Sequence, residues 1–147
     1  MQATDILFIH VAATWALVGL IWTIQLVQYP GFAYISDAEL PALHENYCSR
    51  ITWVVAPLML CELITGLALL SYQPTGVSPG LLWTGLALIV LNWTCTAFVA
   101  VPQHKRLSQL APQARNALVS SNWIRTLTWS ARGVLTLVAL RAALGPV

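Results

Sequence analysis

Four apolar segments, each long enough for a helix to cross a bilayer, constrain this chain more than any other feature. They cover about residues 5–29, 51–70, 81–101 and 120–140. Each is close to the ~20 residues that a helix needs to span the hydrocarbon core. Charged residues make up only 8% of the 147-residue chain, against roughly a quarter in soluble domains. The sequence therefore predicts one all-α integral membrane domain over residues 1–147, folded as an antiparallel four-helix bundle.

Prolines and a capping pattern set the expected ends of these helices. Tyr29-Pro30-Gly31 is expected to end the first span, and Pro102 the third. Before the second span, Ser36 and Glu39 form a Ser-x-x-Glu capping box. This box predicts a short interfacial helix that runs into the second span.

Basic residues are unevenly divided between the two ends of the predicted bundle. Loops 29–50 and 102–119 carry Arg50, Lys105, Arg106 and Arg115, whereas the other end has only Arg141. The positive-inside rule places those two loops in the cytoplasm and both termini outside it, in a bacterial inner membrane. The net charge of +2 is too small to indicate a nucleic-acid partner, so membrane lipids are the expected surroundings.

Three polar side chains are predicted to lie near the middle of the bilayer. At ~1.5 Å of rise per residue, Glu62 lies ~17 Å deep, Arg132 ~18 Å and Asn92 ~15 Å. Isolated charges are costly at this depth, so Arg132 is expected to pair with Glu62, with Asn92 as a third hydrogen-bonding group. Two hypotheses stay open: the pair locks the helices in register, or it forms the floor of a polar cavity open to the cytoplasm.

The fourth span carries a polar stripe with helical spacing. Its members recur at steps of three and four residues: Asn122, Arg125, Thr126, Trp129, Arg132, Gly133 and Thr136. In lipid such a stripe must face the bundle interior. The candidate ligand-binding residues are therefore Gln25, Tyr29, Asn92, Asn122, Arg125 and Trp129. The candidate catalytic residues are Glu62 and Arg132.

The histidines and cysteines do not form a recognised metal-binding motif. Cys48, Cys61 and Cys95 form no C-x-x-C, and two of them lie inside apolar spans, so inert thiols are expected rather than disulfides or a zinc site. His10 is expected near the outer end of the first span, about half a bilayer away from Glu62; a role as a haem ligand stays open.

His44 and His104 lie on the predicted cytoplasmic side and could meet. His44 with Glu45, or His44 with His104, would make an incomplete metal site, and a histidine at headgroup level is the simpler interpretation. No metal is therefore predicted, and no cofactor is assigned.

Two stretches, VPQHKRL at residues 101–107 and NWIRTLTWSARGVLTL at residues 122–137, resemble a bacterial family of small four-span membrane proteins of unknown function that includes the anthrone oxygenases of aromatic polyketide pathways. One is a Val-Pro-x-x-x-Arg-Leu run, here Val101 to Leu107. The other is a Trp followed by an Arg that opens an apolar run, here Trp129 and Arg132. The resemblance implies a compact helical bundle that handles a flat hydrophobic molecule.

The stretch LFIHVAATWALVGLIW at residues 7–22 also resembles, more distantly, the first span of the membrane protoporphyrinogen oxidases that bind haem. The matching residues are His10, Thr14-Trp15 and Gly19-Leu20, and the run RITWVVAPLMLCELITGLALL is similar to the second span of those enzymes. The third span here lacks the lysine that theirs carries.

These observations leave three functional hypotheses. The first is a protein that binds or oxidises a lipophilic aromatic or quinone-like molecule, with Arg125 and Arg132 holding a carbonyl or anionic oxygen and Glu62 orienting Arg132 or acting as a base. The second is a non-enzymatic accessory or assembly subunit, in which the polar stripe meets another chain and Glu62–Arg132 is a structural lock. The third is a proton-coupled transporter, which would need to form a homo-oligomer because four spans are few for one chain.

Overall fold

The computed structural model describes residues 2–108 and 113–145, and these residues contain helices and turns but no strand. Four helices are long and apolar enough to cross a membrane: Ala3–Tyr34, Leu40–Ser71, Pro79–Leu107 and Arg115–Leu144. This confirms the prediction of four such helices, each longer than the apolar segment that predicted it.

The elements follow the chain in a simple order. The first long helix consists of α1 (Ala3–Thr23), the π-helix η1 (Ile24–Gln28), α2 (Tyr29–Gly31) and the 3₁₀-helix η2 (Phe32–Tyr34). The second is α3 (Leu40–Ser71). The third consists of α4 (Pro79–Cys95), the π-helix η3 (Thr96–Ala100) and α5 (Val101–Ser108), and the fourth is α6 (Gln113–Leu144).

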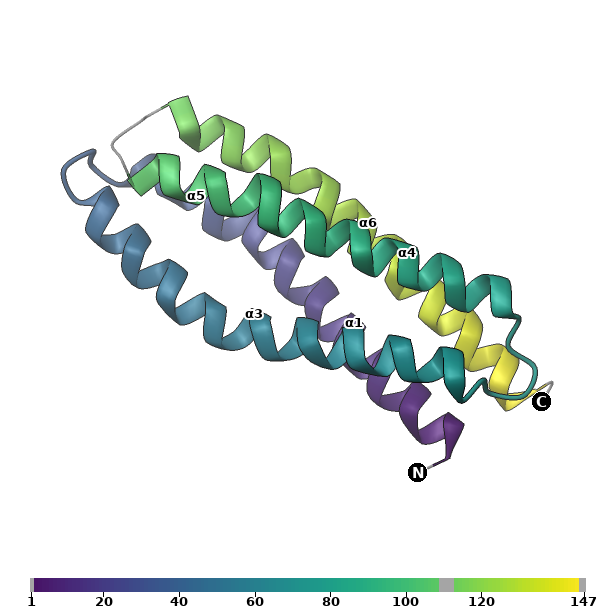
Figure 1. The fold of residues 1–147 in the computed structure, drawn as a ribbon. Coiled ribbons are helices and arrows are strands. Elements are labelled where there is room, and N and C mark those ends of the chain that lie inside the picture. Colours follow the sequence, from purple (N-terminus) through teal and green to yellow (C-terminus); the bar gives the residue numbers. More distant parts are fainter. Residues whose placement is uncertain (1, 109–112, 146–147) are drawn as a thin grey trace.

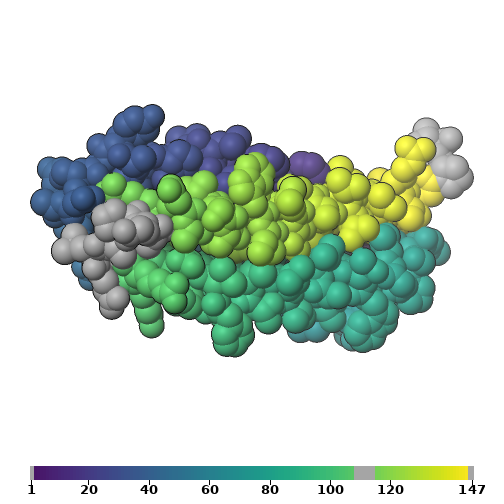
Figure 2. All heavy atoms as spheres, turned by 90° about the horizontal axis from the view of Figure 1, so that it is seen from above, coloured from purple at the N-terminus to yellow at the C-terminus, as the bar shows by residue number. Residues whose placement is uncertain are grey.

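The four long helices pack side by side along the length of the molecule (Figure 1). α1 contacts α3 and α6, and α4 also contacts α3 and α6. Figure 2 shows α6 along one face, between the N-terminal helix and the α4–α5 helix. The first helix begins and the last ends at one end of the molecule, and α3 and α6 begin at the other (Figure 1).

Two helices continue where the sequence predicted that they would end. The first continues through Tyr29-Pro30-Gly31, and the third continues past Pro102, so both expected ends were wrong. In each case a five-residue π-helix, η1 or η3, finishes two residues before the proline. Proline has no N–H to donate to the preceding turn, and the wider π-turn accommodates its ring without breaking the helix.

The segment before the second span is not a separate helix. α3 is continuous from Leu40 to Ser71, with Pro41 in its first turn, where a missing N–H costs little. The capping pair lies just ahead of it: Ser36 Oγ accepts the backbone N–H of Glu39 at 3.4 Å and donates to the Glu39 carboxylate at 2.7 Å. The pattern therefore predicted a real local contact, although the helix starts four residues after Ser36.

Buried side chains form an apolar, a polar and a second apolar layer along the bundle. One apolar cluster includes Leu17, Ile21, Phe32, Leu118 and Trp129. The other includes Ile6, Leu7, Leu69, Val77 and Ala139. On α1, His10 and Thr14 lie between these clusters and are 5% and 0% exposed. The chain therefore places its charged pair in a layer that the packing on both sides seals from solvent.

Candidate functional site

Glu62 and Arg132 form the predicted ion pair between α3 and α6. Arg132 Nε lies 2.8 Å from Glu62 Oε1, and both side chains are 1% exposed. The same carboxylate accepts a hydrogen bond from Thr14 Oγ1 at 3.0 Å and one from Trp129 Nε1 at 3.2 Å. Three donors from two helices, α1 and α6, thus converge on one carboxylate of α3, which is the arrangement that makes a buried charge tolerable.

The remaining Arg132 donors reach α4 and α1. Its Nη1 donates to the Gly85 carbonyl, and its Nη2 lies 2.8 Å from His10 Nε2. His10 Nδ1 in turn lies 2.7 Å from Thr65 Oγ1. Because arginine only donates, His10 Nε2 accepts and its Nδ1–H donates to Thr65. Through Arg132 and Glu62, the network joins all four long helices.

The expected position of His10 was wrong. It was placed half a bilayer away from Glu62, but it contacts the arginine that pairs with Glu62. The first helix begins at Ala3, and this offset brings His10 to the depth of the charged layer. Both ring nitrogens are held by Thr65 and Arg132, so neither is available to ligate haem iron in this arrangement.

Little free space surrounds the charged pair. The cavity lined by His10 and Arg132 is about 30 Å³, enough for a water molecule but not for an aromatic ligand. The predicted third partner, Asn92, does not join the pair. Its side chain is 1% exposed, and neither its Nδ2 nor its Oδ1 has a hydrogen-bond partner among the described residues. That part of the prediction was wrong.

The polar stripe on α6 faces the bundle interior, as predicted. Gln25 Oε1 accepts from Asn122 Nδ2 at 2.8 Å, and Gln25 Nε2 donates to the Val119 carbonyl at 3.2 Å. Asn122 Oδ1 accepts from Arg125 Nη1 at 3.1 Å. Opposite faces of α6 differ sharply in solvent exposure, since Arg125 is 6% exposed and Val134 is 60% exposed.

Arg125 is a buried cation that does not pair with a carboxylate among the residues that the structure describes. Its guanidinium carbon lies 5.1 Å from the ring centroid of Trp129, a cation–π contact, and its Nε has no hydrogen-bond partner within the part of the chain that the structure describes. The ion pairs found there are Arg115–Asp37 and Arg132–Glu62, neither of which involves Arg125. Tyr29 and Asn122 are hydrogen-bond partners of the guanidinium, so what remains is the Nε–H donor and a positive charge without a counter-ion among the described residues.

Arg125 lines a second, much larger cavity of about 470 Å³. This cavity, here called the α3–α5 cavity, lies between α3 and the α4–η3–α5 helix, with η1, α2 and α6 contributing side chains. Its lining is Ile24, Tyr29, His44, Glu45, Tyr47, Cys48, Ile51, Thr52, Val55, Ala56, Met59, Trp93, Thr96, Ala100, Val101, His104, Lys105 and Arg125. Both π-helices contribute to it, which fits their frequent association with functional sites.

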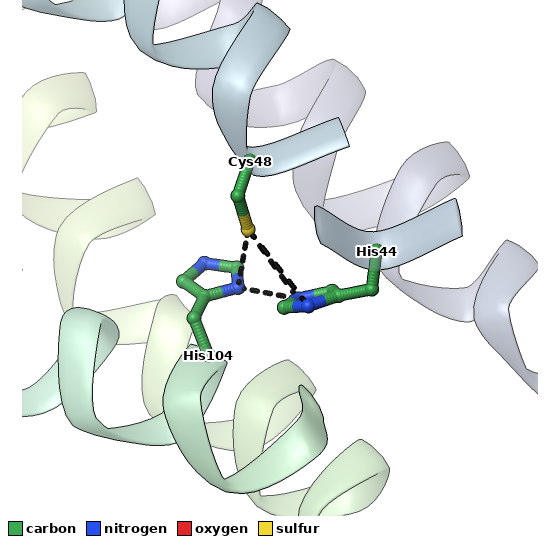
Figure 3. A group of neighbouring side chains, drawn as sticks. All are labelled: His44, Cys48 and His104. Atoms are coloured by element: carbon green, nitrogen blue, oxygen red, sulfur yellow. Dashed lines mark hydrogen bonds between the residues drawn. The ribbon is translucent and has the colours of Figure 1, made fainter. Parts of the chain in front are cut away.

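Three potential metal ligands meet in the wall of this cavity (Figure 3). His44 Nε2 lies 2.8 Å from His104 Nδ1, and Cys48 Sγ lies 3.5 Å from the first of these atoms and 3.6 Å from the second. His44 and Cys48 come from α3 and His104 from α5. Tyr29 Oη lies 3.0 Å from the other nitrogen of His104. The sequence left open whether His44 and His104 meet, and the structure brings them into contact.

The sequence interpretation missed Cys48. It was taken as an inert thiol because it belongs to no C-x-x-C motif. The useful signal was its spacing from His44, because residues four apart share one face of a helix. The proposed partnership with Glu45 is not supported in the same way, since Glu45 lines the cavity but is exposed and does not belong to the cluster.

The predicted ligand-binding and catalytic residues lie in different parts of the bundle. Tyr29 and Arg125 line the α3–α5 cavity. Asn122 and Trp129 contact the Arg125 guanidinium, and Gln25 accepts a hydrogen bond from Asn122. Glu62 and Arg132 belong to the closed layer.

Comparison of the chain with protein-family models, with curated proteins and with solved structures gave no match.

Proposed function

We propose that this chain is a multi-pass membrane protein that binds a lipophilic aromatic or quinone-like molecule in the α3–α5 cavity, with Arg125 holding a carbonyl or anionic oxygen of the ligand. The observation that carries this proposal is a buried cation beside a largely apolar cavity, with no ion-pair partner in the described part of the chain and with its Nε–H unpaired there. An uncompensated charge in a membrane interior is costly and usually marks a functional site.

The size and lining of the cavity support a small molecule rather than a water cluster. Pockets for such ligands measure about 300–1,000 Å³ and combine apolar walls with a few fixed polar groups. Here Tyr47, Met59 and Trp93 supply aromatic and polarisable surface, and Arg125 supplies the directional donor. The same chemistry follows from the resemblance to the four-span family that includes anthrone oxygenases. Oxidation of the bound molecule stays a prediction.

In this proposal the four helices form an antiparallel bundle that crosses the membrane four times. The end that carries Arg50, Lys105, Arg106 and Arg115 faces the cytoplasm, with both termini outside it. The first turns of α3 then lie at the inner interface, and the α3–α5 cavity lies in the half of the bundle nearer the cytoplasm. Labelling of single cysteines placed at Asp37 and Gln73 with an impermeant reagent in intact cells tests this topology. Labelling at position 37 and protection at position 73 would reverse it.

The first test is ligand binding by the detergent-purified chain, with a hydroxynaphthoquinone as the probe and tryptophan quenching as the readout. Removal of one charge-assisted hydrogen bond costs about 1.5–3 kcal/mol. Arg125→Ala should therefore raise Kd roughly 10- to 150-fold. Arg125→Lys should recover part of this loss because it restores the charge but not the guanidinium fork.

Arg115→Ala is the matched control, because Arg115 is a cation at the same end of the bundle that pairs with Asp37 outside the cavity. It should leave Kd unchanged. Equal affinity in wild type and Arg125→Ala, or an equal loss in Arg115→Ala, would refute the assignment. Mass spectrometry of the purified wild type should detect a co-purifying aromatic compound that Arg125→Ala lacks; recovery of phospholipid alone would also count against it.

For Glu62 and Arg132, the geometry favours the structural lock over catalysis. Their donors and acceptors are directed to one another and to α1 and α4, and the adjoining space of about 30 Å³ is too small for an aromatic ligand. If this is correct, Arg132→Met destabilises the fold, and the protein that remains folded binds the hydroxynaphthoquinone with wild-type affinity. A folded Arg132→Met variant that has lost ligand binding would restore Arg132 to the binding site.

A further inference from the structure

We propose that His44, Cys48 and His104 form a three-coordinate protein site for a transition-metal ion such as Zn²⁺, in the wall of the α3–α5 cavity. Two imidazole nitrogens and a thiol from two helices, α3 and α5, converge on one point (Figure 3). Imidazole and thiolate together are the ligand set of zinc and copper rather than of calcium or magnesium. The site does not depend on Arg125 or on an organic ligand.

The interatomic distances fit such an ion. Around a tetrahedral Zn²⁺, with Zn–N near 2.05 Å and Zn–S near 2.3 Å, the N···S separation is about 3.6 Å and the N···N separation about 3.3 Å. The observed N···S distances are 3.5 and 3.6 Å. The N···N distance is 2.8 Å, so the two rings need to separate by only about 0.5 Å to admit the ion.

A simple hydrogen-bonded histidine pair explains less of this arrangement. Such a pair needs one donor and one acceptor nitrogen, but it does not need a sulfur atom within 3.6 Å of both nitrogens. A metal ion uses all three atoms at once. His44 is 0% exposed, which holds its ring in one orientation.

Tyr29 supplies an outer contact of the kind that metal-bound histidines usually have. Its Oη lies 3.0 Å from His104 Nε2, the nitrogen that does not face the cluster. Such a partner fixes the tautomer and orientation of the ring. With Nε2 engaged by Tyr29, His104 presents Nδ1 to the ion.

The fourth coordination position would be available to a ligand. Three protein ligands with a free position are typical of catalytic rather than structural zinc sites. All three side chains line the α3–α5 cavity, so water or an oxygen of a bound molecule could complete the coordination.

The experiment is a Co²⁺ titration of the detergent-purified full chain after removal of metals with a chelator. Wild type should bind Co²⁺ with saturation at one ion per chain, giving a thiolate-to-cobalt charge-transfer band and tetrahedral visible bands that Zn²⁺ abolishes. Cys48→Ser should lose the charge-transfer band, whereas the matched control Cys95→Ser should keep it. Tyr29→Phe should weaken Co²⁺ binding by about 10- to 100-fold and leave the band shape unchanged.

A second measurement keeps the site intact, and so does not depend on the folding of ligand variants. In a Cys61→Ser, Cys95→Ser background, Zn²⁺ should slow the alkylation of Cys48, and Mg²⁺ should not. Absence of a saturable thiolate band in wild type, persistence of the band in Cys48→Ser, or alkylation that Zn²⁺ leaves unchanged would each overturn the proposal.

Discussion

The buried pair Glu62–Arg132 allows a stability prediction with a definite magnitude. In Glu62→Gln, the side chain keeps its shape, but one carboxylate oxygen becomes an amide NH₂. Thr14 and Arg132 direct donors to Oε1, and Trp129 directs one to Oε2, so in either amide orientation a donor faces a donor. Arg132, at 1% exposure, also loses its counter-charge.

The expected loss is about 3–5 kcal/mol, the usual effect of removing one partner of a buried ion pair. Ordinary interhelical hydrogen bonds in membranes contribute only about 0.6 kcal/mol on average, so loss of a buried ion pair is readily distinguished from loss of such a hydrogen bond. The assay is reversible unfolding of the detergent-solubilised protein by SDS, followed by circular dichroism and tryptophan fluorescence.

A double-mutant cycle separates the pair from its surroundings. Arg132→Met removes the buried cation, so adding it to Glu62→Gln should cost less than it does in wild type, with a coupling free energy of up to roughly 3 kcal/mol. Thr136→Val is the control, because the hydrogen bond of the buried Thr136 hydroxyl among the described residues stays within α6, to the Gly133 carbonyl at 2.9 Å. A loss below about 1 kcal/mol in Glu62→Gln, or strictly additive effects, would refute the lock.

Three further predictions use the same unfolding assay. Asn92→Leu should leave stability unchanged or raise it by up to about 3 kcal/mol, because it removes a buried amide without a hydrogen-bond partner among the described residues; a loss above about 1 kcal/mol would reveal a missing partner. Gly66→Ala should lose about 1–3 kcal/mol, since the new Cβ would lie 2.8 Å from a side-chain carbon on α4. Gly19→Ala, where nothing lies within 4 Å, should instead gain about 0.5–1 kcal/mol, and equal effects of the two would contradict this packing. Asp37→Asn should change stability by less than about 1 kcal/mol, because Asp37 is 66% exposed in its pair with Arg115.

Segment length and hydropathy were sufficient to predict the four helices, because the bilayer requires about 20 apolar residues and fully hydrogen-bonded backbone. Helical periodicity similarly predicted that the stripe on α6 faces inward. The partnership of Glu62 with Arg132 followed by elimination, because Glu62 is the only acid deep in any predicted span.

Local sequence rules were less successful at the prolines and in the polar layer. Pro30 and Pro102 indicate helix ends, but a π-turn before each one lets the helix continue. The depth of His10 depended on where the first helix starts. A shift of a few residues moves a side chain by several ångströms, which is enough to exchange one set of partners for another.

The sequence by itself determined the all-helical class, the number of helices apolar and long enough to cross a membrane, and the identity of the buried charges, since these depend on the cost of placing each residue in hydrocarbon. Only the tertiary structure placed His104 beside His44 and Cys48, and separated the closed Glu62–Arg132 layer from the cavity beside Arg125. The physical reason is that such proximity depends on the rotation and register of helices packed against one another. These are set by the summed contacts of whole helix faces, which no local pattern in the chain encodes.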